Sequence, residues 1–161
     1  MKTLQTLFLT ILLSCIAFTG YGQRYLSQIF GPTNIEVDSN VVYGENFELI
    51  SPFQTTVSLK DLVMDIYQPK QSVDTVSERP LMIYLHTGNF LPPPLNGSPT
   101  GLKNDLSATE ICRQFARRGY VAASIYYRLN WNPVSTDADT RRGTLLRAVF
   151  RASIDAKTAV R

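Results

Sequence analysis

The chain has little cysteine, a single histidine and no dense run of charge, and each scarcity excludes a class of protein. Its two cysteines, Cys15 and Cys112, are too few for the disulfide framework of a small secreted scaffold. His86 is the only histidine, and Asp61 and Asp65 have no cluster of ligating residues around them, so we predict no metal site and no cofactor. The net charge of +3 comes from scattered lysines and arginines, which argues against a nucleic-acid partner.

At 161 residues the chain is long enough for one domain with one core and too short for two. We divide it into a predicted signal peptide over residues 1–22, an irregular leader over residues 23–40 and a partial domain over residues 41–161. The apolar, charged, glycine and proline fractions are those of an ordinary globular protein.

The amino terminus has the pattern of a secretory signal. Lys2 opens a short basic region, residues 7–18 are apolar, and Gly20 and Gly22 stand three and one residues before a plausible cleavage point. The mature protein is expected to begin at Gln23 and to be secreted or periplasmic. The apolar stretch is too short to cross a bilayer as a helix, and no later segment is a better candidate, so no membrane span is expected.

An alternative interpretation makes Cys15 the lipid-modified residue of a lipoprotein. Against it, the apolar region continues over residues 16–18. Cleavage at the predicted point would leave Cys112 as the only thiol. Cys112 shares one helix face with apolar neighbours, so we expect a small buried side chain and not a nucleophile.

The first half of the predicted domain has β character. Residues 41–50 are typical of one interrupted strand and residues 59–67 of another, so an antiparallel hairpin is expected. Leu81–Leu85 is continuously apolar, which suits a strand covered on both faces. The proline-rich residues 91–101 predict a surface loop, neither helix nor central strand.

The second half alternates helix and strand. Ser107 and Glu110 have the spacing of a capping box, which predicts a helix to Arg118 with Gly119 in the left-handed position after it. A buried strand follows over residues 120–127. Strand, helix and strand in this order predict a right-handed crossover between two parallel strands.

Residues 130–142 are polar and irregular, and a final helix is expected after them. Its apolar residues recur at steps of three and four up to the penultimate residue, namely Leu145, Val149, Ala152, Ala156 and Val160. No helix stop signal follows, so the chain is interpreted as a fragment.

One turn carries most of the functional information. His86, Thr87, Gly88, Asn89 and Phe90 directly follow the apolar run Leu81–Leu85. Backbone N–H groups in such a turn can stabilise an oxyanion at the carboxyl end of a strand. The segment resembles the His-Gly-Gly-Gly-Phe turn of α/β-hydrolase esterases and lipases, which supplies part of the oxyanion hole. Thr87 and Asn89 replace two of the three glycines.

The resemblance extends in family order from about residue 41 to residue 161. Residues 62–69 resemble the second strand of the family and residues 79–85 its third. Residues 115–121 and 125–129 are similar to its first helix and fourth strand, and residues 151–161 to the helix that leads to the nucleophile. The implied fold is the amino-terminal half of an α/β-hydrolase sheet.

The resemblance implies an exported serine hydrolase acting on small carboxylic esters by acyl transfer, without a cofactor. The family's Gly-x-Ser-x-Gly turn is absent. Its nearest look-alike, residues 97–101, contains Ser98 but has Pro99 at the nucleophile position. By family order the Ser, acid and His of the triad lie beyond residue 161, so the chain alone is expected to be inactive. The alternatives are a non-catalytic hydrolase-like binding module and a complete flavodoxin-like domain.

Each candidate site residue has a plainer interpretation beside the functional one. Gly88 and Asn89 are the expected oxyanion donors, or simply turn formers. His86 is expected to hold the turn structurally, together with Thr87. Trp131 follows a strand end and lines an acyl pocket or packs in the core.

The charged residues near the predicted strands have alternatives of the same kind. Arg128 either binds a carboxylate bidentately or lies on the surface. Asp61 and Asp65 are expected to be solvated carboxylates on a half-exposed strand.

Overall fold

The structure is a computed structural model and describes residues 24–49, 56–97 and 101–161. The predicted signal peptide, including Cys15, lies outside the described residues, as do Gln23, Ile50, Ser98 and Pro99.

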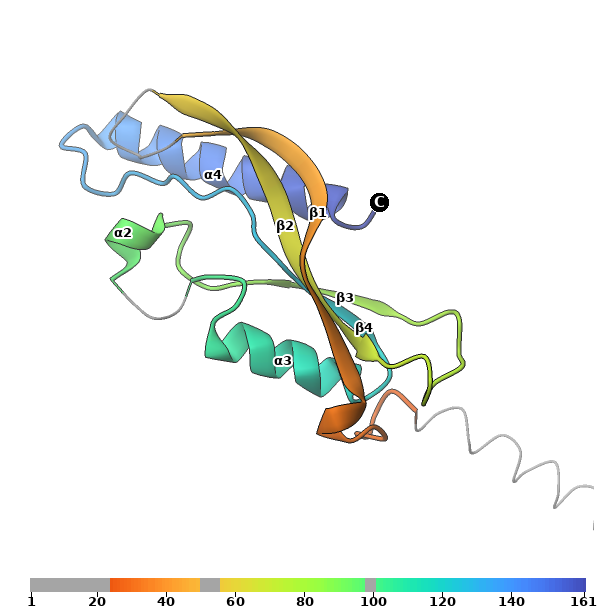
Figure 1. The fold of residues 1–161 in the computed structure, drawn as a ribbon. Coiled ribbons are helices and arrows are strands. Elements are labelled where there is room, and N and C mark those ends of the chain that lie inside the picture. Colours follow the sequence, from red (N-terminus) through yellow and green to blue (C-terminus); the bar gives the residue numbers. More distant parts are fainter. Residues whose placement is uncertain (1–23, 50–55, 98–100) are drawn as a thin grey trace, which may run out of the picture.

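A mixed four-stranded sheet organises the described chain (Figure 1). Its strands are β1 (Ile35–Leu49), β2 (Val57–Pro69), β3 (Leu81–Leu85) and β4 (Val121–Ile125), in the order β1-β2-β4-β3. β1 and β2 form the predicted antiparallel hairpin, and β3 and β4 pair in parallel, as the predicted crossover requires. The arrangement is of the α/β type.

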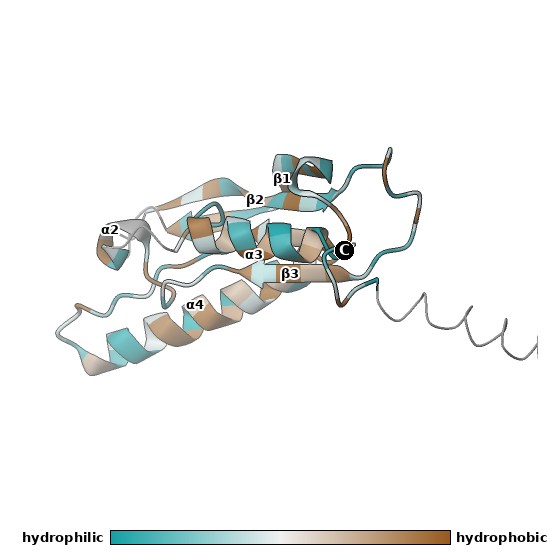
Figure 2. Ribbon diagram, turned by 90° about the horizontal axis from the view of Figure 1, so that it is seen from below, coloured by the Kyte–Doolittle hydropathy of each residue, from teal (hydrophilic) through white to brown (hydrophobic). Residues whose placement is uncertain are grey.

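Two helices cover opposite faces of the sheet, as the views in Figures 1 and 2 show. Under α3 (Leu106–Ala116), Cys112 and Ala116 pack with Ile35, Tyr67 and Ala122. Under α4 (Ala138–Thr158) the buried residues are Ala123, Ile125, Tyr127, Leu129 and Ala152. β4 alternates between the two clusters because successive side chains of a strand point to opposite faces. Cys112 is therefore the expected small buried residue, and burial raises the pKa of its thiol to about 12.

β1 begins earlier than predicted. Residues 35–40, assigned from the sequence to an irregular leader, belong to this strand, with Ile35 buried opposite Pro69 of β2. A short 3-10 turn, Pro32–Asn34, precedes it. The register shifts between Asp38 and Val41, where Asn40 has a φ of 58°. The irregularity lies in an exposed polar stretch, which hid the strand in the sequence.

β3 occupies an edge of the sheet and is not covered on both faces. Leu81 and Leu85 are 46% and 41% exposed, whereas Ile83 between them packs under α4. Continuous apolarity therefore predicted the strand correctly but overestimated its burial in the described chain.

The proline-rich segment contains one helical turn, α2 (Pro93–Asn96), where only a loop was expected. Prolines stand in its first positions, where the N–H groups need no partner within the helix and the fixed φ of proline fits. Gly97, at φ 59°, ends it in the left-handed conformation. Proline excluded a helix interior here but not a first turn.

The residue that caps α3 is Asp105 and not Ser107. The Asp105 carboxylate accepts hydrogen bonds from the Ala108 N–H at 2.7 Å, the Ser107 hydroxyl at 2.8 Å and the Gly101 N–H at 2.9 Å. At the other end Gly119 takes a φ of 96°, as predicted for the residue that follows the helix.

Replacing Asp105 by alanine is expected to lower the free energy of unfolding by about 1–2 kcal/mol, because the helix and the preceding loop both lose their acceptor. Ser107→Ala is the matched control, and we expect a change of less than about 0.5 kcal/mol. Urea denaturation measures both. Equal losses for the two variants would contradict the assignment of the cap.

α4 begins at Ala138, within the stretch predicted to be irregular, because Asp137 caps it by accepting from the Asp139 and Thr140 N–H groups. Its buried residues are Ala148, Ala152 and Asp155, whereas Val149 and Val160 of the predicted stripe are 40% and 61% exposed. The helix is turned about its axis relative to the prediction. Within the described residues, no helix combines the length and apolarity needed to cross a bilayer.

Candidate functional site

The turn after β3 has an unusual backbone. Gly88, Asn89 and Phe90 have φ values of 123°, 53° and 59°, and the Leu91 N–H donates to the Gly88 carbonyl at 2.9 Å. Two successive central residues with positive φ are the mark of a type I′ turn. Asparagine tolerates this conformation, whereas phenylalanine is strained in it by about 1–2 kcal/mol. Thr87, whose branched side chain resists positive φ, is not in this conformation.

Gly88 has a packing requirement as well as a conformational one. A Cβ at this position would lie 3.2 Å from the Cα of Gly101, and Gly101 is itself held by the Asp105 carboxylate at the start of α3. The position of the turn is therefore fixed by the same loop that caps the helix. A side chain at position 88 would displace the turn or the loop.

The backbone N–H groups of Gly88 and Asn89 have no hydrogen-bond acceptor in the described part of the chain, residues 24–49, 56–97 and 101–161. Buried backbone N–H groups are usually paired within the protein, whereas Gly88 is only partly buried and Asn89 is exposed, so water or a ligand can accept from them. Two neighbouring N–H groups without a protein acceptor thus lie just beyond the carboxyl end of the parallel strand β3, and such donors are of the kind that can bind an anion.

His86 lies under the turn, with its side chain only 2% exposed. Its ring stacks on Tyr127 at a centroid distance of 4.4 Å, and its Nδ1 lies 2.8 Å from the Thr87 carbonyl oxygen. The Tyr127 hydroxyl donates to the His86 carbonyl at 2.6 Å. Burial lowers the pKa of the imidazole, which favours its neutral form. These contacts tie β3, the turn and the segment after β4 together.

Protonation of His86 is expected to make stability depend on pH. In the unfolded chain the imidazole has a pKa of about 6.5, and folding lowers that pKa. Below pH 6.5 the unfolded state therefore binds a proton that the folded state binds only at lower pH, and the free energy of unfolding falls between about pH 7 and 5.

His86→Phe keeps an aromatic ring that can stack on Tyr127. It is expected to reduce the decrease in the free energy of unfolding between about pH 7 and 5, because the chain has no other histidine. Urea denaturation across this range provides the measurement. An unchanged pH dependence in the variant would assign the effect to another group.

The segment that follows β4 runs beside the turn. The Trp131 backbone N–H donates to the Phe90 carbonyl at 3.1 Å, and the Phe90 ring meets Tyr127 edge to face with 6.1 Å between the ring centroids. Trp131 is partly buried, and its indole N–H has no acceptor in the described part of the chain. The structure thus brings Trp131, the predicted pocket residue, to the candidate oxyanion turn.

Arg128 forms a buried bidentate ion pair with Asp155 of α4. Its Nε donates to Oδ2 at 2.9 Å, its Nη2 to Oδ1 at 2.7 Å, and its backbone N–H to Oδ2 at 3.0 Å. The bidentate interpretation is confirmed and the surface alternative is wrong. The sequence analysis missed Asp155 as the partner. The available signal was an acidic residue between the apolar Ile154 and Ala156.

Of the two aspartates expected to be solvated, only Asp61 is exposed. Asp65 is 3% exposed, pairs with Lys103 and accepts from the Asn40 N–H at 2.9 Å. The prediction for Asp65 is wrong because a lysine distant in sequence compensates its burial. Within the described residues, no group of three or more histidine, cysteine or carboxylate side chains is placed to hold a metal ion.

Comparison of the chain with models of protein families, with curated proteins and with solved structures finds no match. We therefore infer function from the residues and contacts described above.

Proposed function

We propose that the protein is an exported serine esterase, and that residues 41–161 supply the oxyanion-hole half of its α/β-hydrolase domain. The supporting observation is the pair of unpaired N–H groups at Gly88 and Asn89, held at the carboxyl end of β3. They would stabilise the negative charge that develops on the ester carbonyl oxygen when a serine attacks it.

In this proposal His86 positions the turn and is not the general base. Its ring is buried against Tyr127, with Nδ1 beside the Thr87 carbonyl, so it has no path to a substrate proton. The Ser, acid and base His of the triad are proposed to lie beyond residue 161, and the 161-residue chain alone is proposed to be inactive. Trp131 would form a wall of the substrate pocket.

The two edges of the sheet support an extension beyond β3. β1, at one edge, carries acidic residues and two register shifts, which protect an exposed edge from pairing. β3, at the other edge, has no charge, no proline and no register shift along its five residues. Leu81 and Leu85 are also exposed on the face that α4 covers at Ile83. A further strand beside β3 would pair this edge and cover these side chains.

The test uses the complete protein encoded by the gene, assayed with short-chain p-nitrophenyl esters. Gly88→Ala is expected to lower kcat by about 100-fold to 1,000-fold with little change in KM, because a displaced donor stabilises the oxyanion less. Gly97→Ala is the matched control. It also places alanine at positive φ, but its Cβ meets nothing within 4 Å, so we expect kcat to change by less than about threefold.

Labelling with a fluorophosphonate probe, which marks an activated serine, separates the alternatives. A labelled serine outside residues 1–161 supports the proposal. Labelling of Ser98 would contradict it. Absence of both labelling and ester hydrolysis in the complete protein would favour the non-catalytic binding module, for which the loss of two glycines at Thr87 and Asn89 is the specific observation.

A further inference from the structure

α4 exposes large apolar side chains on the side that faces away from the sheet. Leu146 and Phe150 are 70% and 68% exposed. At about 100° per residue they lie on the opposite side of the helix from the buried Ala148, Ala152 and Asp155. A further strand beside β3 would lie in the plane of the sheet, on the inner side of α4, and would not cover this outward face. Figure 2 shows hydrophobic colour recurring along α4.

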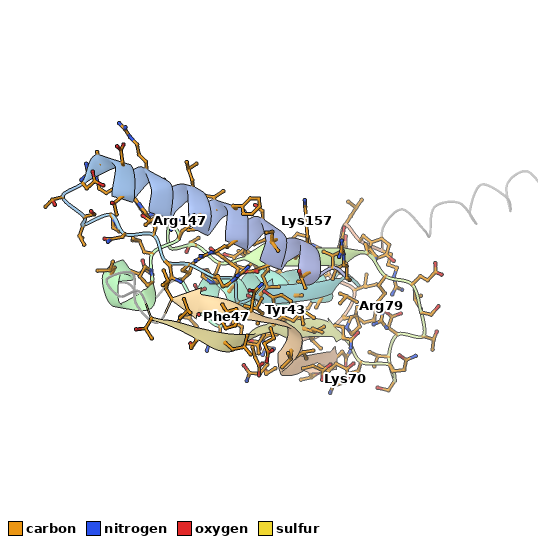
Figure 3. The ribbon with its side chains drawn as sticks, turned by 90° about the horizontal axis from the view of Figure 1, so that it is seen from above. Tyr43, Phe47, Lys70, Arg79, Arg147 and Lys157 are labelled. Carbon is orange, nitrogen blue, oxygen red and sulfur yellow. The ribbon has the colours of Figure 1, made fainter. Side chains whose placement is uncertain are left out.

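Cations surround the same outward face. Arg142, Arg147 and Lys157 of α4 are all exposed, as is Arg161 three residues beyond the end of the helix. The only one with a carboxylate partner among the described residues is Arg142, which meets Asp139 at 3.6 Å in a solvent-exposed pair. Figure 3 shows α4 lying across the sheet with Arg147 and Lys157 along it. The face therefore combines an apolar centre with uncompensated positive charge.

The combination of apolar and positively charged side chains indicates which kind of molecule binds this face of α4. A second copy of the chain would bring like charges together, which disfavours a symmetric contact between two such helices. A protein partner would have to supply a groove for a convex helix face and acidic residues for its cations. An anionic lipid surface needs only what the helix presents, because apolar side chains enter the interface while lysine and arginine stems reach the headgroups.

We propose that the outward face of α4 binds an anionic lipid surface, with the helix axis lying in the plane of the interface. This inference is independent of the proposed esterase activity, because it uses no residue of the turn. The apolar residues supply contact with the acyl boundary, and the cations supply selectivity for negatively charged headgroups.

The experiment measures co-sedimentation of the complete protein with vesicles of phosphatidylglycerol and of phosphatidylcholine. We expect binding to the first and little to the second, weakening as salt is added. Leu146→Glu with Phe150→Glu is expected to lower the partition coefficient at least tenfold. Arg147→Gln and Lys157→Gln are each expected to lower it by about fivefold.

Leu106→Glu is the matched control, because Leu106 is 90% exposed on α3, on the other side of the sheet. It is expected to change vesicle binding by less than twofold. Circular dichroism verifies that each variant folds, and ester hydrolysis is expected to be unchanged in all of them. Equal binding to both lipids, or an equal loss in the Leu106 variant, would overturn the proposal. Binding of the protein to polyglutamate without binding to vesicles would also overturn the proposal, because it would indicate an acidic polypeptide as the partner.

Discussion

Replacement of Asp155 by alanine is expected to lower the free energy of unfolding by about 3–5 kcal/mol, because it leaves the guanidinium of Arg128 buried without its counter-charge. Arg128 and Asp155 are 5% and 1% exposed, and the carboxylate accepts three kinds of donor from Arg128, namely Nε, Nη2 and the backbone N–H. The pair also joins α4 to the segment that follows β4. Urea denaturation followed by circular dichroism measures the loss.

Asp139→Ala is the matched control for this variant. Asp139 also pairs with an arginine, Arg142, but both side chains are largely exposed, at 90% and 79%. Such a pair contributes at most about 0.5 kcal/mol. The double variant Arg128→Met with Asp155→Leu is expected to recover much of the loss, because it removes both charges and keeps apolar volume. A loss in Asp155→Ala no larger than that in Asp139→Ala would contradict a structural role for the pair.

The elements that the sequence predicted well are those with short-range signals. The five apolar residues of Leu81–Leu85 matched β3 at both ends, and the hairpin followed from two strand patterns joined by a short connection. Gly119 was recognisable because few residues other than glycine follow a helix with φ near 96°. Each of these signals depends on conformation or hydrophobicity within a few residues, which the sequence displays directly.

The features that the sequence predicted poorly depend on distant partners. Asp65 is buried because Lys103 reaches it from a loop 38 residues later. α4 turns Asp155 inward, where it pairs with Arg128, and in this orientation Val149 lies at the surface. A helical pattern of apolar residues gives the broad face of a helix, but one buried ion pair changes which residues of that face are covered.

The candidate site also has features that the sequence predicts and features that depend on distant partners. The turn could be located from His86 and Gly88, and the bidentate role of Arg128 could be stated as one of two alternatives. The left-handed conformation of Phe90 could not be predicted from the sequence, because nothing in a phenylalanine side chain favours positive φ. It depends on the contacts of Phe90 with Tyr127 and with the backbone of Trp131, which lie about 40 residues further along the chain.

Residues 23–161, expressed alone, are expected to self-associate and to bind hydrophobic dyes. β3 is an apolar, uncharged and unprotected edge, and Leu81 and Leu85 are exposed beside it. Edge strands of natural proteins carry charge, proline or bulges that prevent pairing with another chain, and β3 has none of them. Two copies pairing along β3 would satisfy its free backbone groups, so we expect a dimer or larger species by light scattering, together with strong dye fluorescence.

Lysine substitutions test whether this edge is responsible. Leu81→Lys with Leu85→Lys is expected to shift the protein toward the monomer and to reduce dye fluorescence severalfold, because charge on an edge strand opposes pairing. Leu106→Lys, at a more exposed leucine on α3, is the control and is expected to leave the association unchanged. If the unsubstituted protein is a monomer that unfolds in a sharp and reversible two-state transition, β3 is not an open edge that requires a partner. The proposal that the sheet continues beyond β3 would then fail, since a stable isolated edge of this composition has no need of a further strand.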